Sequence, residues 1–450
     1  MISRRRFIER AMAVAAGALL SACSTPTVPK AEETNWLTAE DISNMPKTTI
    51  RYWFYESPER ITLGEKQVQE FQAKFKNIEV VGRQAPPAVD NNALLAYIKA
   101  GTNSHVHHSY YQEDLWYIDH NVPYSPEGLP GFEKVIASLN PNANYKYKDK
   151  VWSLPWYLGG QAIAYNKKMV NAAGLDPNSP PNTYSQFYEW AKALTIPGKQ
   201  WFMAPSTGED WWIWLFVLQP FYIAATGTGD LVKPDGKTPI FNNDGYAAAL
   251  QLFYDLFKNK YATSENFSTD PFLGGQVAAT IGGVDMHKGI QRDGPKDFEY
   301  IVGPIPKPDG SSVQGNKTFL FVRNLMLIKE IQKKGEEADR IMRAAWEFEK
   351  FLLSPEQMAA DFAVSGEPPA AVDVTTNPLY VSISGALGPQ FQWHVKYIAE
   401  QGVKADMNSG RSVDIDDIQQ KMYLNIIRNK MQPAEALKWA EEETIKLLAD

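Results

Sequence analysis

The stretch VWSLPWYLGGQAIAYN, residues 151–166, decides the expected fold. Its β-branched and aromatic residues predict a strand. Pro155 interrupts this strand, a Gly-Gly pair makes the backbone more flexible, and the strand continues at residues 162–165. A strand broken in this way is typical of a segment that crosses between two bodies. We therefore expect Trp156 and Tyr157, which follow the break, to lie at the mouth of a cleft between those bodies, where ligands tend to bind.

Two later apolar stretches have the same interrupted character. Residues 276–285 form a strand that ends in a glycine pair, and residues 319–328 form a strand with Arg323 and Asn324 in its middle. Three such crossings would leave each body assembled from non-contiguous pieces and let the two bodies rotate and close on a ligand. The residues expected to act as hinges are Gly159, Gly160, Gly282 and Gly283.

The composition is that of a folded protein with an unusual share of aromatic residues. A chain of 450 residues is too long for one core and predicts two or three domains. Its hydrophobic content of 44% and charged content of 22% are ordinary, and a net charge of −7 gives no reason to expect a nucleic-acid partner. The aromatic content is 12%, with 13 Trp. Because a buried indole N–H needs a partner, this excess favours a cleft that stacks on flat ligands or sugar rings, beside a bulky core that accounts for part of it.

The N-terminus carries an export signal. An arginine-rich start, a short apolar run and a small-residue cleavage site predict a signal peptide over residues 1–22. Residues 3–8 resemble the twin-arginine signal, with Glu9 where a Lys is usual, and ordinary Sec export is the alternative. Residues 20–23, LSAC, resemble the bacterial lipobox, so Cys23, the only cysteine, is expected to be lipidated. We expect the mature protein to be anchored by lipid to the outer face of the cytoplasmic membrane, in the periplasm or at the cell surface.

The folded part opens with alternating strands and helices. Residues 50–55 predict a strand, and Ser57 followed by Pro predicts the start of a helix. A short strand at 78–81 and a helix at 91–100 follow. This order predicts an α/β body with a mainly parallel sheet, and helices dominate the chain after residue 328.

Several motifs, taken in order, resemble the extracellular solute-binding proteins (family 1, maltose-binding-protein-like) of bacterial ABC sugar importers, lipoprotein type. The resemblance covers essentially the whole chain. The segments that carry it are the lipobox, Trp53, Ala100-Gly101-Thr102, Trp152-Ser153-Leu154-Pro155-Trp156, Tyr165-Asn166-Lys167-Lys168, Phe272-Leu273-Gly274-Gly275-Gln276, Gly303-Pro304-Ile305-Pro306, Ser354-Pro355-Glu356 and Pro433-Ala434-Glu435-Ala436-Leu437.

The resemblance implies a two-lobe periplasmic-binding-protein fold of type II-like topology, with about three hinge segments and a helix-rich C-terminal part. It implies a monomer that binds a carbohydrate, most simply an oligosaccharide, and delivers it to an ABC permease with its ATPase. No chemistry on the ligand, no cofactor and no metal are implied. The expected divisions are a signal peptide at 1–22, a tether at 23–48, an N-terminal lobe at 49–158 plus 284–322, and a C-terminal lobe at 159–283 plus 323–450.

Two departures from the family pattern alter the expected cleft. After Ala100-Gly101-Thr102 the family usually has Pro-Asp, whereas this chain has a segment that ends in His107-His108. After Gly282-Gly283 the family often places a Trp, whereas this chain has Asp285. Both positions line the cleft by analogy, so we expect a ligand other than the familiar malto-oligosaccharides.

Aromatic and acidic residues alternate among the candidate ligand contacts because a sugar offers C–H faces that stack and hydroxyls that hydrogen-bond. Burying roughly 100 Å² of sugar C–H surface contributes about 2.5 kcal/mol. Micromolar affinity requires about 8 kcal/mol, so charge-assisted hydrogen bonds must supply the remainder. The candidates, with Glu113 and Trp211 in the same loops, are Trp53, Tyr55, Glu56, Ser109, Tyr110, Gln112, Trp156, Tyr157, Asp210, Trp212, Asp285 and Glu367.

Two other functions remain open at the level of sequence. A secreted glycoside hydrolase would also use a Trp-rich cleft and two carboxylates, such as Glu209/Asp210 or Asp414/Asp416, although no recognisable catalytic frame surrounds either pair. A metal-binding protein would use His105, His107 and His108, of which the first and second share a face on a strand.

Overall fold

The computed structural model describes residues 42–54, 57–86, 91–144, 146–147, 149–405, 408–428 and 430–449, without the side chains at positions 91, 92, 111 and 112. The expected signal peptide, residues 23–41 of the expected tether, including the lipidation site Cys23, and Tyr55 and Glu56 lie outside these residues. Within the described ranges, no helix is both long enough and apolar enough to cross a membrane.

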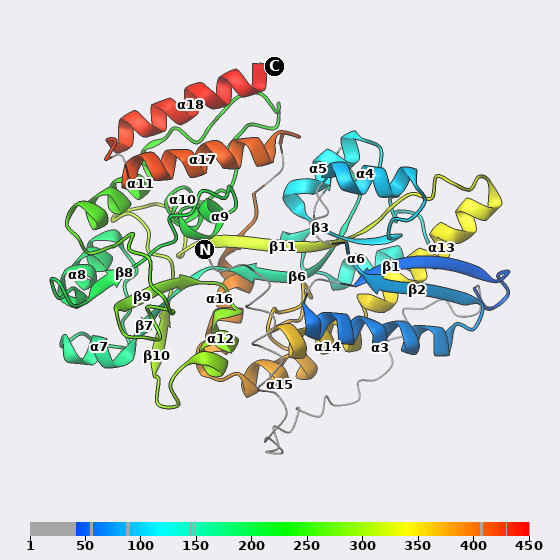
Figure 1. Cartoon of the computed structure of the whole chain (residues 1–450), viewed down its shortest axis with the longest axis horizontal. Helices are drawn as coiled ribbons and strands as arrows, with labels where there is room; N and C mark the ends of the chain where they lie inside the picture. Colours follow the sequence, from blue (N-terminus) through cyan, green and yellow to red (C-terminus); the bar gives the residue numbers. More distant parts are fainter. Residues whose placement is uncertain are drawn as a thin grey trace.

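Two sheets form the centres of two lobes that lie side by side along the longest axis of the molecule (Figure 1). The first sheet has the strand order β12-β11-β3-β1-β2, with β6 also paired to β11, and the second has the order β10-β7-β9-β8. The strands are β1 Thr48–Phe54, β2 Ile78–Gln84, β3 Val106–Tyr110, β4 Lys146–Tyr147, β5 Lys150–Val151, β6 Leu154–Gly160, β7 Ala162–Asn166, β8 Trp201–Met203, β9 Val277–Gly282, β10 Tyr300–Gly303, β11 Thr318–Leu327 and β12 Gly402–Val403.

Helices cover both sheets (Figure 1). They are α3 Pro58–Lys74, α4 Asn91–Lys99, α5 Tyr111–Asp119, α6 Phe132–Ser138, α7 Lys167–Ala172, α8 Tyr184–Leu194, α9 Ile213–Val217, α10 Gln219–Thr226, α11 Asp244–Lys258, α12 Met286–Asp293, α13 Glu336–Leu352, α14 Pro355–Ser365, α15 Pro378–Ala386, α16 Pro389–Gln401, α17 Ser412–Ile427 and α18 Pro433–Ala449, with a short 3-10 turn at Pro141–Ala143.

Local signals start these helices where the sequence predicts. Ser57 caps α3 by accepting the backbone N–H of Arg60, with Pro58 in the first turn. Thr183 and Gln186 form the capping box of α8. β1 pairs in parallel with both β2 and β3, which confirms an α/β opening with a parallel sheet.

The expected lobe boundaries are wrong in several places: α12 packs in the second lobe and α14 in the first, and two further segments show the same. β10 pairs antiparallel with β7, so residues 300–303 belong to the second sheet and not to the N-terminal lobe. α13 packs on the first sheet, where the ring centroid of Phe348 lies 4.9 Å from that of Tyr52, so this helix belongs to the first lobe. α17 and α18 pack with α11 in the second lobe, as expected. Pairing between strands far apart in the chain sets these boundaries, and no local signal encodes it.

The stretch that crosses between the lobes breaks at one residue. β6 continues through Pro155 to Gly160, and the change to β7 comes at Gln161. Pro155 fits within β6 because the pairing with β11 shifts register there, and a bulge tolerates the missing N–H. The expectation that Pro155 ends the strand is therefore wrong.

The glycine pair of this crossing lies within a paired strand. Gly159 and Gly160 face Phe321 and Leu320 of β11. A Cβ on Gly160 would lie 2.5 Å from Cγ2 of Ile398 and 2.9 Å from the carbonyl oxygen of Phe319. Close packing explains why position 160 is a glycine. The prediction that this pair makes the backbone flexible is therefore corrected.

Candidate functional site

A cavity of about 620 Å³ lies where the two sheets meet. First-lobe residues come from β3, α5, β6 and the segment after α14, and second-lobe residues come from the loop before α9, from α9 and from the turn between β9 and α12. The described lining residues are Tyr110, Glu113, Tyr157, Gly159, Gly160, Gln161, Trp211, Trp212, Leu215, Phe216, Ile281, Gly282, Gly283, Val284, Asp285, Phe321 and Glu367.

A chain of aromatic rings runs across this cavity from one lobe to the other. Trp212 is 47% exposed and its ring centroid lies 6.2 Å from that of Phe216 in α9. Phe216 lies 5.8 Å from Phe321 of β11, which in turn lies 5.6 Å from Tyr110 at the end of β3. These rings offer apolar faces on which a flat or ring-shaped ligand can stack.

The wall of the first lobe is held in place by a buried arginine. The guanidinium carbon of Arg60, in α3, lies 4.5 Å from the ring centre of Tyr157. Its Nε and Nη2 each donate to Asp361 of α14 at 2.9 Å, and Nη2 lies 2.8 Å from Oε2 of Glu367. Backbone hydrogen bonds from the segment that follows Glu367 to β6, such as Leu158 N–H to the Pro368 oxygen at 2.8 Å, fix this carboxylate at the cavity.

Three carboxyl groups line the cavity, and each has an elevated pKa. Burial raises the pKa of Glu113, in the first turn of α5, to about 7, although the Arg323 guanidinium acts in the opposite direction. Desolvation raises the pKa of Asp285, although this residue is exposed, and that of the half-buried Glu367. The negative charge of Asp285 adds to the rise at Glu367.

Several predicted contact residues do come together at this cavity. Tyr110, Tyr157, Trp212, Asp285 and Glu367 line it, as do all four predicted hinge glycines, Gly159, Gly160, Gly282 and Gly283. Whether these residues bind a ligand remains a prediction. The space beside Gly282 and Gly283 is filled by Met286 and by the Asp285 carboxylate, so these glycines also serve close packing.

Two predicted aromatic contacts lie in the core instead. Trp156 is 4% exposed and packs between Arg60 and His108 without lining the cavity, whereas Tyr157, itself only 2% exposed, does line it. Trp53 is buried in a separate cluster against Tyr97. The expectation that these two indoles face the cleft is corrected.

The remaining predicted contacts lie elsewhere. Ser109 is fully buried in β3, and Asp210 is exposed beside the cavity without lining it. The side chain of Gln112, like Tyr55 and Glu56, lies outside the described residues. Gln161, Phe216 and Phe321 line the cavity and were not predicted, although the alternation of aromatic residues along β11 would have indicated Phe321.

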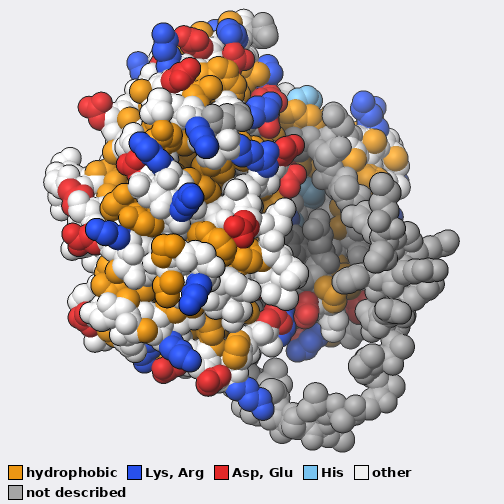
Figure 2. Space-filling model, turned by 60° about the vertical axis from the view of Figure 1, so that its left-hand side comes forward, with side chains coloured by type: hydrophobic (Ala, Val, Ile, Leu, Met, Phe, Trp, Pro, Cys, Tyr) orange, Lys and Arg blue, Asp and Glu red, His pale blue; other side chains and the backbone are white. Residues whose placement is uncertain are grey.

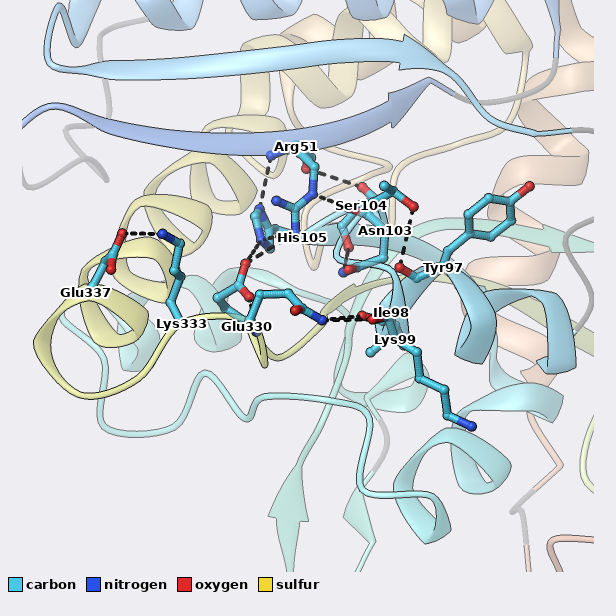
Figure 3. A network of polar contacts seen from close by, with 12 residues as sticks. Arg51, Tyr97, Ile98, Lys99, Asn103, Ser104, His105, Glu330, Lys333 and Glu337 are labelled. Atoms are coloured by element: carbon cyan, nitrogen blue, oxygen red, sulfur yellow. Dashed lines mark hydrogen bonds and ion pairs between the residues drawn. The ribbon is translucent and has the colours of Figure 1, made fainter.

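The histidines at the start of β3 belong to separate structural networks. The backbone N–H of Arg51 donates to Nδ1 of His105 at 3.0 Å, so Nε2 carries the proton that is donated to Glu330 at 3.1 Å (Figure 3). His107 packs edge-on to Tyr117, while His108 lies 3.0 Å from the Tyr52 hydroxyl. Among the described residues, no group of three or more His, Cys, Asp or Glu is suited to hold a metal ion. The alternative that His105, His107 and His108 bind a metal is therefore not supported.

Comparison with known proteins shows where this architecture occurs. The family model of bacterial extracellular solute-binding proteins matches residues 66–382. The cyclic alpha-maltosyl-1,6-maltose binding protein of Arthrobacter globiformis superposes with a TM-score of 0.77 at 19% identity, covering 90% of this chain and 99% of that one. The sugar-binding protein MalE of Xanthomonas citri superposes with a TM-score of 0.75 at 16% identity, covering 89% and 98%. These structures confirm the expected α/β two-lobe fold.

A curated relative supports the same grouping over a shorter span. The sn-glycerol-3-phosphate-binding periplasmic protein UgpB of Pectobacterium atrosepticum is 25% identical over 215 residues, which are 46% of this chain. The chain spans about half the length of that relative, at 45%.

Proposed function

Because the chain belongs to the family of bacterial extracellular solute-binding proteins, we propose that it binds a carbohydrate between its lobes and delivers it unchanged to an ABC importer. The observation that carries this proposal is the cavity of about 620 Å³, whose lining comes from both lobes and combines a chain of aromatic rings with carboxylates. An oligosaccharide presents the matching surfaces, which are flat C–H faces and hydroxyl edges. The names of the two structural relatives point to the same ligand class.

The two kinds of lining residue have different tasks. Stacking on one ring contributes about 2.5 kcal/mol for roughly 100 Å² of buried sugar surface. Each hydrogen bond to a charged group contributes about 1.5–3 kcal/mol, so Glu113, Asp285 and Glu367 supply the larger share and reject a misplaced hydroxyl. Together these contributions are large enough for micromolar binding.

The ligand acts by favouring the closed arrangement of the lobes. Trp212 and Asp285 come from the second lobe, while Tyr110 and Glu367 come from the first. A sugar that contacts all four binds better when the lobes are together, and it shifts the equilibrium by that difference in affinity. The closed form is the one that docks on the permease, whose ATPase drives import.

We extend the proposal to the N-terminus. A signal peptide at 1–22 and lipidation of Cys23 would place a monomer at the outer face of the cytoplasmic membrane. Mass spectrometry of the protein from the membrane fraction tests this: an acylated N-terminal Cys supports it, and Cys23→Ala should release the protein from the membrane.

No described observation favours a hydrolase. Glu209 pairs with Arg428 and Asp414 pairs with Arg411, both at exposed positions, and none of the acidic residues of those two candidate pairs lines the cavity.

A panel of oligosaccharides tests the proposed function. Trp fluorescence and melting temperature should change in a saturable way, with the sugar recovered intact by mass spectrometry. New reducing ends would show that the sugar is hydrolysed and would contradict a role in binding the sugar for transport. The absence of any saturable response across the panel would reject carbohydrate as the ligand class.

A further inference from the structure

The polar groups of the cavity are strongly biased towards hydrogen-bond acceptors. Among the described residues that line it, none is Lys, Arg or His, while Asp285 and Glu367 contribute carboxylates and Glu113, whose pKa burial raises to about 7, contributes a carboxyl group. Charges of both signs are interspersed on the outer face of the molecule drawn in Figure 2. The cleft therefore differs in charge from that surface.

A buried amide adds a further acceptor. Gln161, at the change from β6 to β7, is 5% exposed, and its Oε1 has no hydrogen-bond partner among the described atoms. Leaving such an oxygen unsatisfied destabilises the unliganded site, so a ligand that donates a hydrogen bond to it gains affinity. Carboxylates are acceptors only, whereas an ammonium group has three donors and no acceptor.

The cations nearest to the cavity are already engaged with other groups and are outnumbered by carboxyl groups. Arg60 is already shared between Asp361 and Glu367, and Arg323 lies under the ring of Tyr110, its guanidinium carbon 3.5 Å from the ring centre. Asp285 forms no ion pair with any described residue. Lys288, whose side chain lies beside Gly366, donates to the backbone oxygen of Val364. Against these three cations stand five carboxyl groups at or just behind the lining, Glu113, Asp114, Asp285, Asp361 and Glu367.

The aromatic lining suits a cation as well as a sugar ring. The faces of Trp and Tyr attract an ammonium group placed within about 6 Å, and this attraction strengthens when water is excluded. Asp285 lies at the start of α12 in the second lobe and Glu367 follows α14 in the first, and both line the same cavity, so a positive group between them would attract both carboxylates and join the two lobes.

We infer that the cleft selects a carbohydrate bearing a protonated amine, held by Asp285 and Glu367 from opposite lobes while its rings stack on Trp212 and Tyr110. This inference rests on the proposed function and narrows its ligand class. The amine supplies donors to the carboxylates and to Gln161 Oε1 without adding acceptors that the cleft would have to satisfy.

Matched sugars separate the inference from the proposed function. Titration calorimetry at pH 6 and low salt compares a trimer of glucosamine with a trimer of N-acetylglucosamine, which has the same rings without the charge. Maltotriose, glycerol 3-phosphate and an aliphatic diamine complete the panel. We expect the glucosamine trimer to bind at least about tenfold more tightly than either neutral trimer and to lose affinity as salt is added.

A charge-neutral variant locates the effect. Asp285→Asn should weaken binding of every trimer, because it removes a charged acceptor, and should abolish the preference for the amine, so that the glucosamine trimer and the neutral trimers bind with affinities within about threefold of one another. Asp414→Asn is the matched control, because Asp414 pairs with Arg411 on an exposed part of α17 away from the cavity, and it should change nothing.

The possible results are distinct. Equal or tighter binding of a neutral trimer or of glycerol 3-phosphate overturns the inference while a solute-binding role stands. Binding of the diamine without any carbohydrate overturns both the carbohydrate proposal and the inference. An amine preference that survives in Asp285→Asn overturns the role given to that residue.

Discussion

Nη2 of Arg60 lies 2.8 Å from Oε2 of Glu367, and the same guanidinium group donates two hydrogen bonds of 2.9 Å to the carboxylate of Asp361. α3 of the first lobe thereby holds in place a carboxylate that lines the cleft between the lobes. The arginine also lies over the rings of Trp156 and Tyr157, so one side chain supports both the aromatic and the acidic part of the wall.

Removing this arginine should destabilise the protein strongly. Arg60→Met leaves Asp361 buried without its partner, and breaking a buried pair in this way costs about 3–5 kcal/mol. Urea unfolding followed by circular dichroism measures the loss. Lys66→Met is the control on the same helix, because Lys66 and Glu70 are both exposed and such pairs contribute less than about 1 kcal/mol. Similar losses in the two variants would contradict the structural role of Arg60.

Two tryptophans should separate stability from binding. Trp156→Ala removes a buried side chain and should lower the free energy of unfolding by about 3–5 kcal/mol. Trp212→Ala removes an exposed ring at the cavity and should change it by less than about 0.5 kcal/mol, while weakening sugar binding at least about tenfold. Thermal unfolding and fluorescence titration measure the two effects. If Trp212→Ala bound sugar normally, the stacking role would be rejected.

Gly160 should not tolerate a side chain. Gly160→Ala brings Cβ to 2.5 Å from Cγ2 of Ile398 and 2.9 Å from a backbone oxygen, and overpacking of this kind costs about 1–3 kcal/mol. Gly289→Ala is the matched control: a Cβ there meets nothing within 4 Å, and alanine in helix α12 should stabilise by about 0.5–1 kcal/mol. Denaturant unfolding measures the stability of both variants. If Gly160→Ala were as stable as the parent, the role of Gly160 in close packing would be rejected.

A buried carboxyl in α13 should make the protein less stable at alkaline pH. Burial raises the pKa of Glu349 from 4.5 to about 8, and its Oε2 has no hydrogen-bond partner among the described atoms. The folded state therefore holds this proton more tightly than the unfolded state does. The stabilisation is fully present below pH 4.5 and is lost as pH rises towards 8, with a slope approaching about 1.4 kcal/mol per pH unit.

The comparison with an uncharged variant isolates this group. Glu349→Gln should flatten the decline in the free energy of unfolding between pH 5 and pH 8 relative to the parent. Glu337 lies on the same helix as Glu349 and forms an exposed ion pair with Lys333, which precedes the helix. Glu337→Gln should therefore leave the pH dependence of the free energy of unfolding as it is in the parent. Parallel profiles for Glu349→Gln and the parent would show that Glu349 is ionised in the folded state.

Local sequence signals determined much of this protein. The caps at Ser57 and Thr183 and the order of strands and helices predicted the α/β opening, because such signals act over a few neighbouring residues, and the order of several motifs, through the family resemblance, implied the two-lobe fold with a cleft. They also indicated Tyr157, Trp212 and Asp285, which do line the cavity.

Tertiary structure alone decided which side of each strand faces the cleft and which segments belong to each lobe. Trp156 and Tyr157 are adjacent and similar in character, yet only Tyr157 lines the cavity. The pairing of β6 with β11 and the packing of Arg60 from α3 hold the Trp156 indole in the core. Likewise, β10 joins β7 across more than a hundred residues. The physical reason is that the register of a strand ladder and the packing of distant helices depend on contacts between residues far apart in the chain, which leave no trace in local periodicity.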